Sequence, residues 1–434
     1  MTSRPLWRGR ALALLGIVLV AFSLRSAVAS LSPVIDHVAK DFPISAVVVG
    51  LIGSAPPVCY AVFGLLTPVV ERRFGLERVA IVAIAVMSIG LLLRGVAVDA
   101  ASLLGATTLV FAGVGSGNVL LPPLVKKYFP DRLGVMMTLY STTMAVSTFL
   151  PPLVAVPLAD TLGWRVSLGM WGVIALSALA PWVTMFVTAK TDAVPAGKRA
   201  ATQSTNLDAA SDAFTAAEVA TGPITISPAN PRIFGRLWRL PLAWALALVF
   251  AASSSMAYAS FAWMPTILVD IGGVTPATAG FLLSLFAAVG LPCALVVPVL
   301  VVRYHATRAL FFVSVGAGLV GLAGLMFAPT AALTAWVVIF GLTAILFPLS
   351  LVLLSIRART PESAVALSGF VQSIGYGVAA LYPIVLGVLH EVSGGWQLPL
   401  MMLAALLVVA GPAGWVAGGR QTIEEEWVRR HGRW

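Results

Sequence analysis

The feature that most constrains this chain is a series of long segments without a charged residue. Six such segments contain no Asp, Glu, Lys or Arg: 42–70, 133–159, 240–269, 271–302, 309–356 and 392–419. About 20 apolar residues suffice for one helix to cross the hydrocarbon core of a bilayer. Each segment is therefore long enough for a crossing, and 309–356 is long enough for two, with a turn expected at Pro329. The pattern predicts a polytopic helical membrane protein.

Composition leads to the same conclusion. Of the 434 residues, 59% are hydrophobic and only 10% are charged, and the mean hydropathy is +0.98. Soluble domains carry about 25% charged residues, so this chain lies outside the soluble class. We expect an all-α integral membrane protein with twelve transmembrane helices, at about 10–33, 46–70, 79–97, 101–125, 134–158, 165–189, 240–268, 277–302, 309–328, 331–356, 363–389 and 397–418.

The net charge of +10 indicates membrane topology rather than a nucleic-acid partner. With twelve spans and both termini in the cytoplasm, all but four of the 27 Lys and Arg residues fall in cytoplasmic segments. This distribution follows the positive-inside rule. We expect a multi-pass protein of the cytoplasmic membrane with both termini cytoplasmic. The four exceptions are Arg25, Lys40, Arg94 and Arg165.

The two halves of the sequence repeat each other on either side of a polar segment. A shift of 230 residues carries Gly50 onto Gly280, Pro68 onto Pro298, Arg73 onto Arg303 and Arg78 onto Arg308. We expect two pseudo-symmetric six-helix bundles, 1–189 and 240–418, and a cytoplasmic tail, 419–434. The linker 190–239 is rich in Ala, Thr, Ser and Pro, so we expect it to be largely disordered and to end in a short interfacial helix. Such a duplication is typical of secondary transporters, which bind their substrate between the halves.

Arg25 is a permanent positive charge inside the first span. It follows Arg10 by about 15 residues, or roughly 22 Å along a helix. A mid-span arginine costs about 2.5–3.5 kcal/mol to insert, so it normally faces a cavity or a partner. All 17 acidic residues lie in loops, tails or span ends. The substrate is therefore a candidate partner, because a guanidinium binds planar or carboxylate-like anions. Alternatively, Arg25 bonds backbone carbonyls at a helix break or extends outward toward Asp36.

Several stretches of the sequence carry a family resemblance. The most specific are "GNVLLPPLVKKYFPDRLGVMMTLYST" across the fourth and fifth spans and "LSGFVQSIGYGVAALYPIVLGVLHEVSGGW" in the eleventh, supported by "LRSAVASLSPVIDHV" in the first and "YASFAWMPTILVDIG" in the seventh. Through them the chain resembles the major facilitator superfamily, and within it the cyanate and 2-nitroimidazole transporters. The resemblance implies the two-bundle major facilitator fold and rocker-switch transport of a small anionic or polar heterocyclic solute. We expect a functional monomer in the lipid bilayer, without a cofactor or metal.

Three polar residues of the fourth, fifth and seventh spans are candidates for the substrate site. Asn118 stands in "GSGNVLLPP", where small residues allow helices to approach closely and an amide to point inward. An interhelical hydrogen bond is an equally good role for it. The resemblance implies that the fifth and seventh spans line the cavity, which makes Tyr140 and Tyr258 candidates as well.

Four further side chains lie closer to span ends or to the family-like block of the eleventh span. Trp263 is expected near the outer interface, either in a gate or in an aromatic belt. Gln372 and Tyr376 are four residues apart on one helical face, which favours a substrate or gate role. We expect Arg94, near the end of the third span, to extend toward the outer surface beside Asp99.

Other functional classes fit the sequence less well. A broad-specificity drug or metabolite efflux pump is the alternative in the same fold, although a pump for cations usually has an acidic pocket. A membrane sensor is less expected, because the linker and the tail are too short and polar for an output domain. An enzyme is not expected, because the sequence contains no HExxH, GxSxG or paired-aspartate motif at membrane depth.

Overall fold

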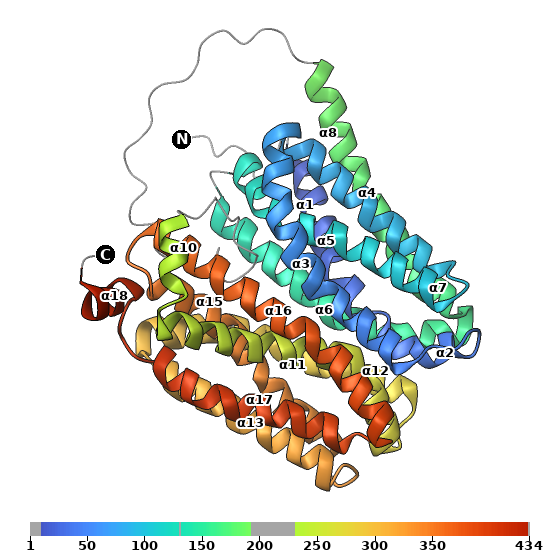
Figure 1. Cartoon of the computed structure of the whole chain (residues 1–434). Coiled ribbons are helices and arrows are strands. Elements are labelled where there is room, and N and C mark those ends of the chain that lie inside the picture. Colours follow the sequence, from blue (N-terminus) through green and yellow to red (C-terminus); the bar gives the residue numbers. More distant parts are fainter. Residues whose placement is uncertain (1–9, 130–131, 192–230, 433–434) are drawn as a thin grey trace.

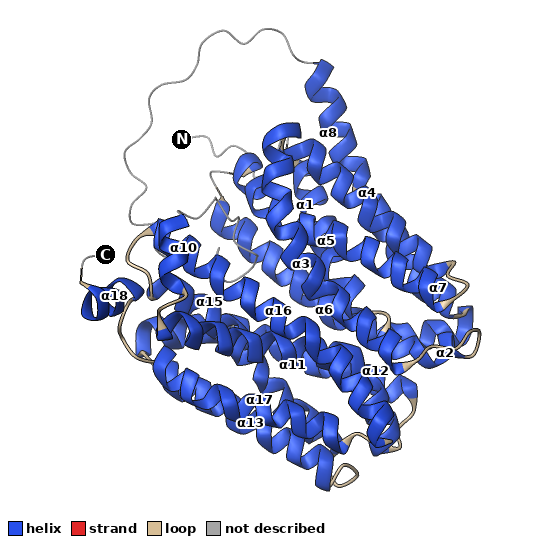
Figure 2. Cartoon of the chain, in the orientation of Figure 1, coloured by secondary structure: helices blue, strands red, loops and turns tan. Residues whose placement is uncertain are grey.

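The computed structural model describes residues 10–129, 132–191 and 231–432, and every regular element in these ranges is a helix (Figures 1 and 2). Twelve segments of these ranges are long and apolar enough to cross a membrane. The predicted all-α class and the predicted number of spans are therefore confirmed. The predicted linker is described only at its two ends, and the rest of it lies outside the described residues.

The N-terminal half comprises α1 to α8. Its first span is shorter than predicted, because α1 ends at Ala29 and the chain continues through a separate 3₁₀ turn that contains Pro33. Its sixth span is built from two consecutive helices, α7 and α8. The elements are α1 (Ala11–Ala29), η1 (Ser32–Val34), α2 (Ile35–Ala39), α3 (Ala46–Phe74), α4 (Leu76–Gly95), α5 (Ala100–Tyr128), α6 (Leu133–Leu162), α7 (Trp164–Ser177) and α8 (Leu179–Thr191).

The C-terminal half comprises α10 to α18. Its fourth span is continuous along the chain but consists of α14, a 3₁₀ turn η2 and α15. The elements are α10 (Pro231–Leu237), α11 (Pro241–Gly272), α12 (Pro276–Tyr304), α13 (Thr307–Phe327), α14 (Leu333–Gly341), η2 (Leu342–Ile345), α15 (Leu346–Ile356), α16 (Pro361–Ser393), α17 (Gln397–Ala417) and α18 (Ile423–His431).

The internal repeat is visible at the ends of equivalent helices. Ser45 caps the N-terminus of α3 and Thr275 caps that of α12, each accepting a backbone N–H at 3.3 Å. The same two helices end in residues with positive φ, Gly75 at 87° and His305 at 51°. Each pair is separated by the 230 residues of the sequence repeat. The second span of each half therefore begins and ends at equivalent positions.

A matching pair of side-chain contacts also recurs in both halves. The indole N–H of Trp164 donates to Asp41 at 3.0 Å, and that of Trp396 donates to Asp270 at 2.7 Å. Each tryptophan begins or precedes the last span of its half, Asp41 follows α2, and Asp270 lies in the last turn of α11. Both tryptophans follow a glycine, Gly163 and Gly395, and in each half the Trp–Asp hydrogen bond ties together two helix ends.

The two halves meet along α3 with α16 and along α6 with α12. A Cβ atom on Gly50 of α3 would lie 2.7 Å from the Pro383 carbonyl oxygen of α16, so only glycine allows this approach. Gly280 of α12 packs equally closely against the backbone of α6. Nearby, the Ala46 N–H donates to Glu391 at 2.8 Å. These contacts lie at the end of the molecule where α2 is found (Figure 1), which we call the α2 end.

Two short helices lie at the opposite end, which we call the α18 end (Figure 1). A short helix, α10, is present where the interfacial helix was predicted, and Trp238 after it contacts Phe370 of α16 with ring centroids 5.2 Å apart. Within the predicted tail, Thr422 caps α18, and the Ile423 N–H donates to the Arg357 carbonyl at 2.9 Å. The predicted domain boundaries and the cytoplasmic position of these helices remain predictions.

Candidate substrate site

A cavity of about 260 Å³ lies between the two halves. Helices α1 and α6 form one wall, and α11, α12, η2, α15 and α16 form the other. Most lining side chains are apolar or aromatic, with a few polar groups among them, which is usual for small-molecule sites. The polar lining residues are Arg25, Thr148, Ser253, Ser254, Tyr258, Thr343 and Tyr376.

Arg25 is the one charged side chain among the described residues of this wall. It lies well inside α1, as its spacing from Arg10 predicts, and is partly exposed to the cavity. Within the described part of the chain it forms no ion pair with an acidic residue and no hydrogen bond with a backbone carbonyl. Neither alternative partner, a carbonyl at a helix break or Asp36, is therefore bonded to it.

Three tyrosines lie next to Arg25 and form what we call the tyrosine cluster: Tyr60 of α3, Tyr258 of α11 and Tyr376 of α16. Their ring centroids are 6.2, 6.3 and 6.4 Å apart in pairs, with steep interplanar angles that match edge-to-face packing. With Tyr140, these are the ionisable side chains that interact most strongly with the Arg25 guanidinium. Because Tyr60 belongs to the N-terminal half, the cluster joins the two halves beside the cavity.

Two predicted site residues, Tyr140 and Asn118, lie behind the cavity wall. Tyr140 is fully buried in α6, within electrostatic range of Arg25. Asn118 of α5 is 2% exposed and lies beside the Tyr60 hydroxyl. Neither its Oδ1 nor the Tyr60 hydroxyl meets hydrogen-bond geometry with any described group. Both residues are therefore placed to support the side chains that face the cavity.

Gln372 and Trp263 are also held away from the cavity by their contacts. Gln372 is one helical turn before Tyr376, and its amide donates to Ser368 of the same helix at 2.7 Å. Trp263 is 2% exposed, and its indole N–H donates to the Pro383 carbonyl of α16 at 2.8 Å. That carbonyl is the group approached by Gly50, so Trp263 stabilises the part of α16 that meets the N-terminal half.

The expectation for Arg94 is wrong. Its side chain does not extend to the surface but is 1% exposed inside the N-terminal half. Nη1 donates to the Ala27 carbonyl at 2.8 Å, and Nε donates to the Thr107 hydroxyl at 3.1 Å. The physical reason is the early end of α1, because the carbonyls of its last turn have no helical partner and accept hydrogen bonds from elsewhere.

Several residues of this site were missed by the sequence analysis, among them the wall residues Thr148, Ser253, Ser254 and Thr343. Of the tyrosine cluster, Tyr60 was missed. It is 5% exposed and contacts Tyr258, Tyr376 and Phe111. A signal was available, because it is the one tyrosine of its span, and a hydroxyl at that depth needs a polar partner. The phenylalanines of the wall gave no such signal, since a sequence does not distinguish a cavity-facing phenylalanine from a lipid-facing one.

A helical membrane protein of twelve spans, with a cavity between two related halves, has the architecture of a secondary transporter. Comparison with known families agrees with this class, because the sequence description of the Major Facilitator Superfamily matches residues 15–380. The chain belongs to the Major Facilitator Superfamily. It is a membrane transporter and not an enzyme.

Three relatives match over nearly the whole chain. The uncharacterized transporter YycB of Bacillus subtilis (strain 168) is 32% identical over 420 residues, 96% of each chain. The 2-nitroimidazole transporter of Escherichia coli (strain K12) is 29% identical and covers 96% of this chain and 98% of its own. The cyanate transport protein CynX of the same organism is 24% identical, with 91% and 95% covered. The predicted resemblance is thereby confirmed at modest identity.

Solved structures show the same fold. The nucleoside transporter NupG superposes with a TM-score of 0.70 at 12% identity, covering 94% of this chain and 99% of its own. A bacterial homologue of the human lysosomal transporter Spinster, in an inward-facing and unoccupied conformation, superposes with a TM-score of 0.69 at 16% identity, covering 100% and 99%. These identities are too low to carry a substrate, so these similarities establish the fold alone.

Proposed function

We propose that this transporter moves a small anionic or planar polar heterocyclic solute, cyanate-like or nitroimidazole-like, across the cytoplasmic membrane. Two of its relatives are a 2-nitroimidazole transporter and a cyanate transport protein. Both names describe small, planar or linear, electron-rich solutes. Arg25, on the wall of the central cavity, is the residue that binds the solute.

The observation that carries this proposal is the lack of an acidic partner for Arg25. An arginine inside a membrane protein normally pairs with an acidic side chain, a carbonyl or a ligand. Arg25 faces the cavity without an ion pair to any described acid. A bound anion would supply the missing charge, and the planar guanidinium fork would orient a flat or linear anion through paired hydrogen bonds.

The tyrosine cluster supplies the neutral part of the site. Tyr258 and Tyr376 line the cavity beside Arg25, and their hydroxyls donate hydrogen bonds without adding a negative charge. Their rings, with those of Phe286 and Phe347, provide flat apolar surface on which a heterocycle would pack. The same wall would therefore accept an anion at the guanidinium and a planar ring next to it.

Alternating access fits the way the halves meet. The close glycine contacts and the Ala46–Glu391 hydrogen bond join the halves at the α2 end. Solute would then reach the cavity from the α18 end, which is the cytoplasmic end if both termini are cytoplasmic, as the distribution of basic residues predicts. Rocking of the two halves about the tyrosine cluster would open the α2 end and close the other. We propose that one chain is sufficient for this cycle.

A thermal-shift screen of the purified full-length protein tests the proposal. Potassium cyanate and 2-nitroimidazole are added separately to the parent protein, to Arg25→Ala and to Arg165→Ala. Arg165 is the matched control, because it is an arginine of the same half that pairs with Asp41 at the exposed α2 end. We expect cyanate to raise the melting temperature of the parent and of Arg165→Ala, and to leave that of Arg25→Ala unchanged.

Two outcomes would contradict the proposal. Equal stabilisation of the parent and Arg25→Ala by cyanate would remove Arg25 from the site. Stabilisation by lipophilic organic molecules, with none by cyanate or 2-nitroimidazole, would favour the alternative of a broad-specificity efflux pump. The mostly apolar and aromatic wall of the cavity is the observation that keeps that second function in consideration.

A further inference from the structure

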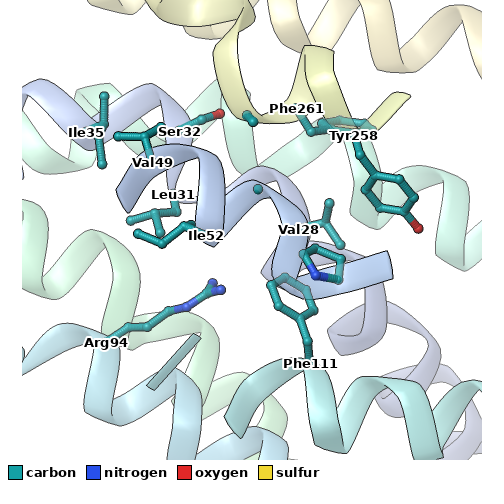
Figure 3. Close-up of a pocket in the computed structure, with 13 residues that line it drawn as sticks. Val28, Leu31, Ser32, Ile35, Val49, Ile52, Arg94, Phe111, Tyr258 and Phe261 are labelled. Carbon is teal, nitrogen blue, oxygen red and sulfur yellow. The ribbon is translucent and has the colours of Figure 1, made fainter. Parts of the chain in front are cut away.

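A second, smaller cavity of about 30 Å³, whose lining residues Figure 3 shows, shares Tyr258 with the tyrosine cluster and extends to Ser32 and Ile35 toward the α2 end. Val28, Tyr258 and Phe261 line both this cavity and the large one, so they form the partition between the two. The remaining lining comes from η1 and the residues that flank it, from the first half of α3, from α4 and α5, and from one further residue of α11. Both halves of the protein therefore contribute to it.

Arg94 gives this small cavity its own buried positive charge. Its guanidinium points toward the cavity from α4 (Figure 3). Two of its nitrogens, Nε and Nη1, donate to Thr107 and Ala27. Nη2 has no hydrogen-bond partner in the described ranges, and no acid there pairs with Arg94. The Phe111 ring covers one side of the guanidinium, with 5.2 Å from Cζ to the ring centroid.

A second polar group on the same wall also lacks a partner. Ser32 of η1 is 8% exposed, and its hydroxyl forms no hydrogen bond with any described residue. A buried hydroxyl without a partner is costly, so such groups usually bond to a water molecule or a ligand. Arg94 and Ser32 thus both belong to the lining of one small, otherwise apolar space between the two halves, Arg94 on one side of it and Ser32 on the other (Figure 3).

We propose that the cavity beside Arg94 is a second binding station for a small monovalent anion, on the path between the central site and the α2 end. This inference rests on the proposed function, since it extends the path of the same solute. A cavity of this volume holds about two water molecules, so in this conformation it accommodates an ion no larger than a halide or cyanate.

The position of the station makes it sensitive to the transport cycle. Val49 and Ile52 of α3 face Phe261 and Ala262 of α11 across this cavity, and these helices belong to opposite halves. Separation of the halves at the α2 end would therefore widen the cavity and expose Arg94. An anion that entered from that end would meet Arg94 first and would pass Tyr258 and Phe261 to reach Arg25.

Bromide is a suitable probe, because it is a monovalent anion that is located by anomalous scattering. Crystals of the full-length parent, Arg25→Ala and Arg94→Gln would be soaked in sodium bromide. We expect an anomalous peak within hydrogen-bond distance of Arg94 Nη2 in the parent and in Arg25→Ala, and none in Arg94→Gln. A parent structure with only water beside Arg94 would overturn the inference while leaving the Arg25 site intact.

Cyanate flux into proteoliposomes of known protein orientation gives a second test, in which Ser32→Ala probes the cavity while Arg94 stays in place. For flux from the α2 side we expect Ser32→Ala to raise the half-saturating concentration about threefold, and Arg94→Gln to raise it about tenfold. Flux from the α18 side should change less than about twofold in both variants. Arg25→Ala should weaken flux from both sides, so a failure of the central site is distinguishable from a failure of this one.

Thr107→Val is the matched control for a purely structural role of Arg94. It removes one hydrogen bond that holds the guanidinium but does not line the cavity. We expect a lower melting temperature and an unchanged half-saturating concentration from the α2 side. If Thr107→Val produced the same one-sided increase as Ser32→Ala, or if Ser32→Ala changed neither side, the anion station would be ruled out.

Discussion

Arg25 and Arg94 are two arginines of the same half in opposite environments. Arg25 faces a cavity of about 260 Å³ and has tyrosines as its ionisable neighbours. Arg94 is 1% exposed, holds the Ala27 carbonyl and the Thr107 hydroxyl, and faces a cavity of about 30 Å³. The Arg25 guanidinium has no acid or carbonyl as a partner among the described residues, whereas two of the three Arg94 nitrogens donate hydrogen bonds to other groups of the protein.

The difference follows from where α1 ends. Arg25 lies in the regular part of α1, where the helix satisfies its own carbonyls, so the side chain has no backbone group to bond. Ala27 lies in the last turn of α1, where a carbonyl needs an outside donor, and Arg94 supplies it. A charge in a span is therefore held mainly by the protein where it lies beside a helix end, and is left available for a ligand where it lies in the regular part of a helix.

The largest expected effect is on stability, which should respond in opposite ways when the Arg94 charge and the Arg25 charge are removed. Arg94→Met should lower the free energy of unfolding by about 3 kcal/mol, because two hydrogen bonds to a charged donor are lost inside the protein. Arg25→Met should leave it unchanged or raise it, because an uncompensated charge is replaced by an apolar side chain of similar length. Unfolding by SDS in mixed micelles, followed by tryptophan fluorescence, measures both variants.

The comparison would fail if the two variants lost similar stability. In that case Arg25 would also have a structural role in the protein without bound solute, and its guanidinium would not be free to bind a ligand. An Arg165→Met variant serves as the control, since its surface ion pair with Asp41 is expected to contribute less than about 1 kcal/mol.

Sequence patterns were sufficient to predict the helical scaffold and part of the candidate substrate site. The uncharged segments predicted the twelve spans, and the shift of 230 residues predicted the equivalent helix ends seen at Ser45 and Thr275. The position of Arg25 followed from helical rise alone. These features are local, because each depends on composition or spacing along one segment of chain.

What the sequence did not predict depends on contacts between segments that lie far apart along the chain. Arg94 was expected at the surface because its nearest acid in sequence is Asp99, whereas its actual partners come from α1 and α5. Trp263 was expected at an interface or in a gate, and its hydrogen bond to a carbonyl of α16 was not predicted. Tyr60 was missed because its neighbours, Tyr258 and Tyr376, belong to the other half. Sequence spacing contains no information on these pairings.

A smaller effect is expected when one neutral partner of each arginine is removed. Thr107→Val should lower the free energy of unfolding by about 1 kcal/mol, the usual size of a hydrogen bond between membrane helices. Tyr258→Phe should cost less, because Tyr258 lines the cavity beside Arg25, which has no acid or backbone carbonyl as a partner among the described residues. It should instead weaken cyanate binding several-fold, since one hydrogen-bond donor of the site is lost.

Isothermal titration with cyanate and SDS unfolding of the same two variants separate these responses. A loss of stability in Tyr258→Phe that equalled that of Thr107→Val would indicate that both arginines are structural. A loss of cyanate affinity in Thr107→Val without loss in Tyr258→Phe would reverse the assigned roles.

The smallest effect is expected at the exposed α2 end, where Asp41 is the acidic partner of Arg165. Its guanidinium and the Trp164 indole donate to Asp41, and these bonds lower the pKa of that carboxyl. A lowered folded pKa means that the ionised form is favoured in the folded state. Asp41 therefore contributes stability above its unfolded pKa of about 3.9, and that contribution is lost as the pH falls through the folded value.

Asp36, on α2 of the same end, should show the reverse dependence. Partial burial raises its pKa, and the carboxyl of Asp270 raises it further, while His37 and Lys40 oppose the shift. Stability should therefore decrease as the pH rises from about 4 through the raised folded pKa. Unfolding of Asp41→Asn and Asp36→Asn, measured between about pH 3 and pH 7, tests both signs. Relative to the parent, the first variant should lose stability mainly at the upper end of this range, and the second should gain it there. Equal profiles for the two variants would mean that neither carboxyl is perturbed by the contacts seen at the α2 end.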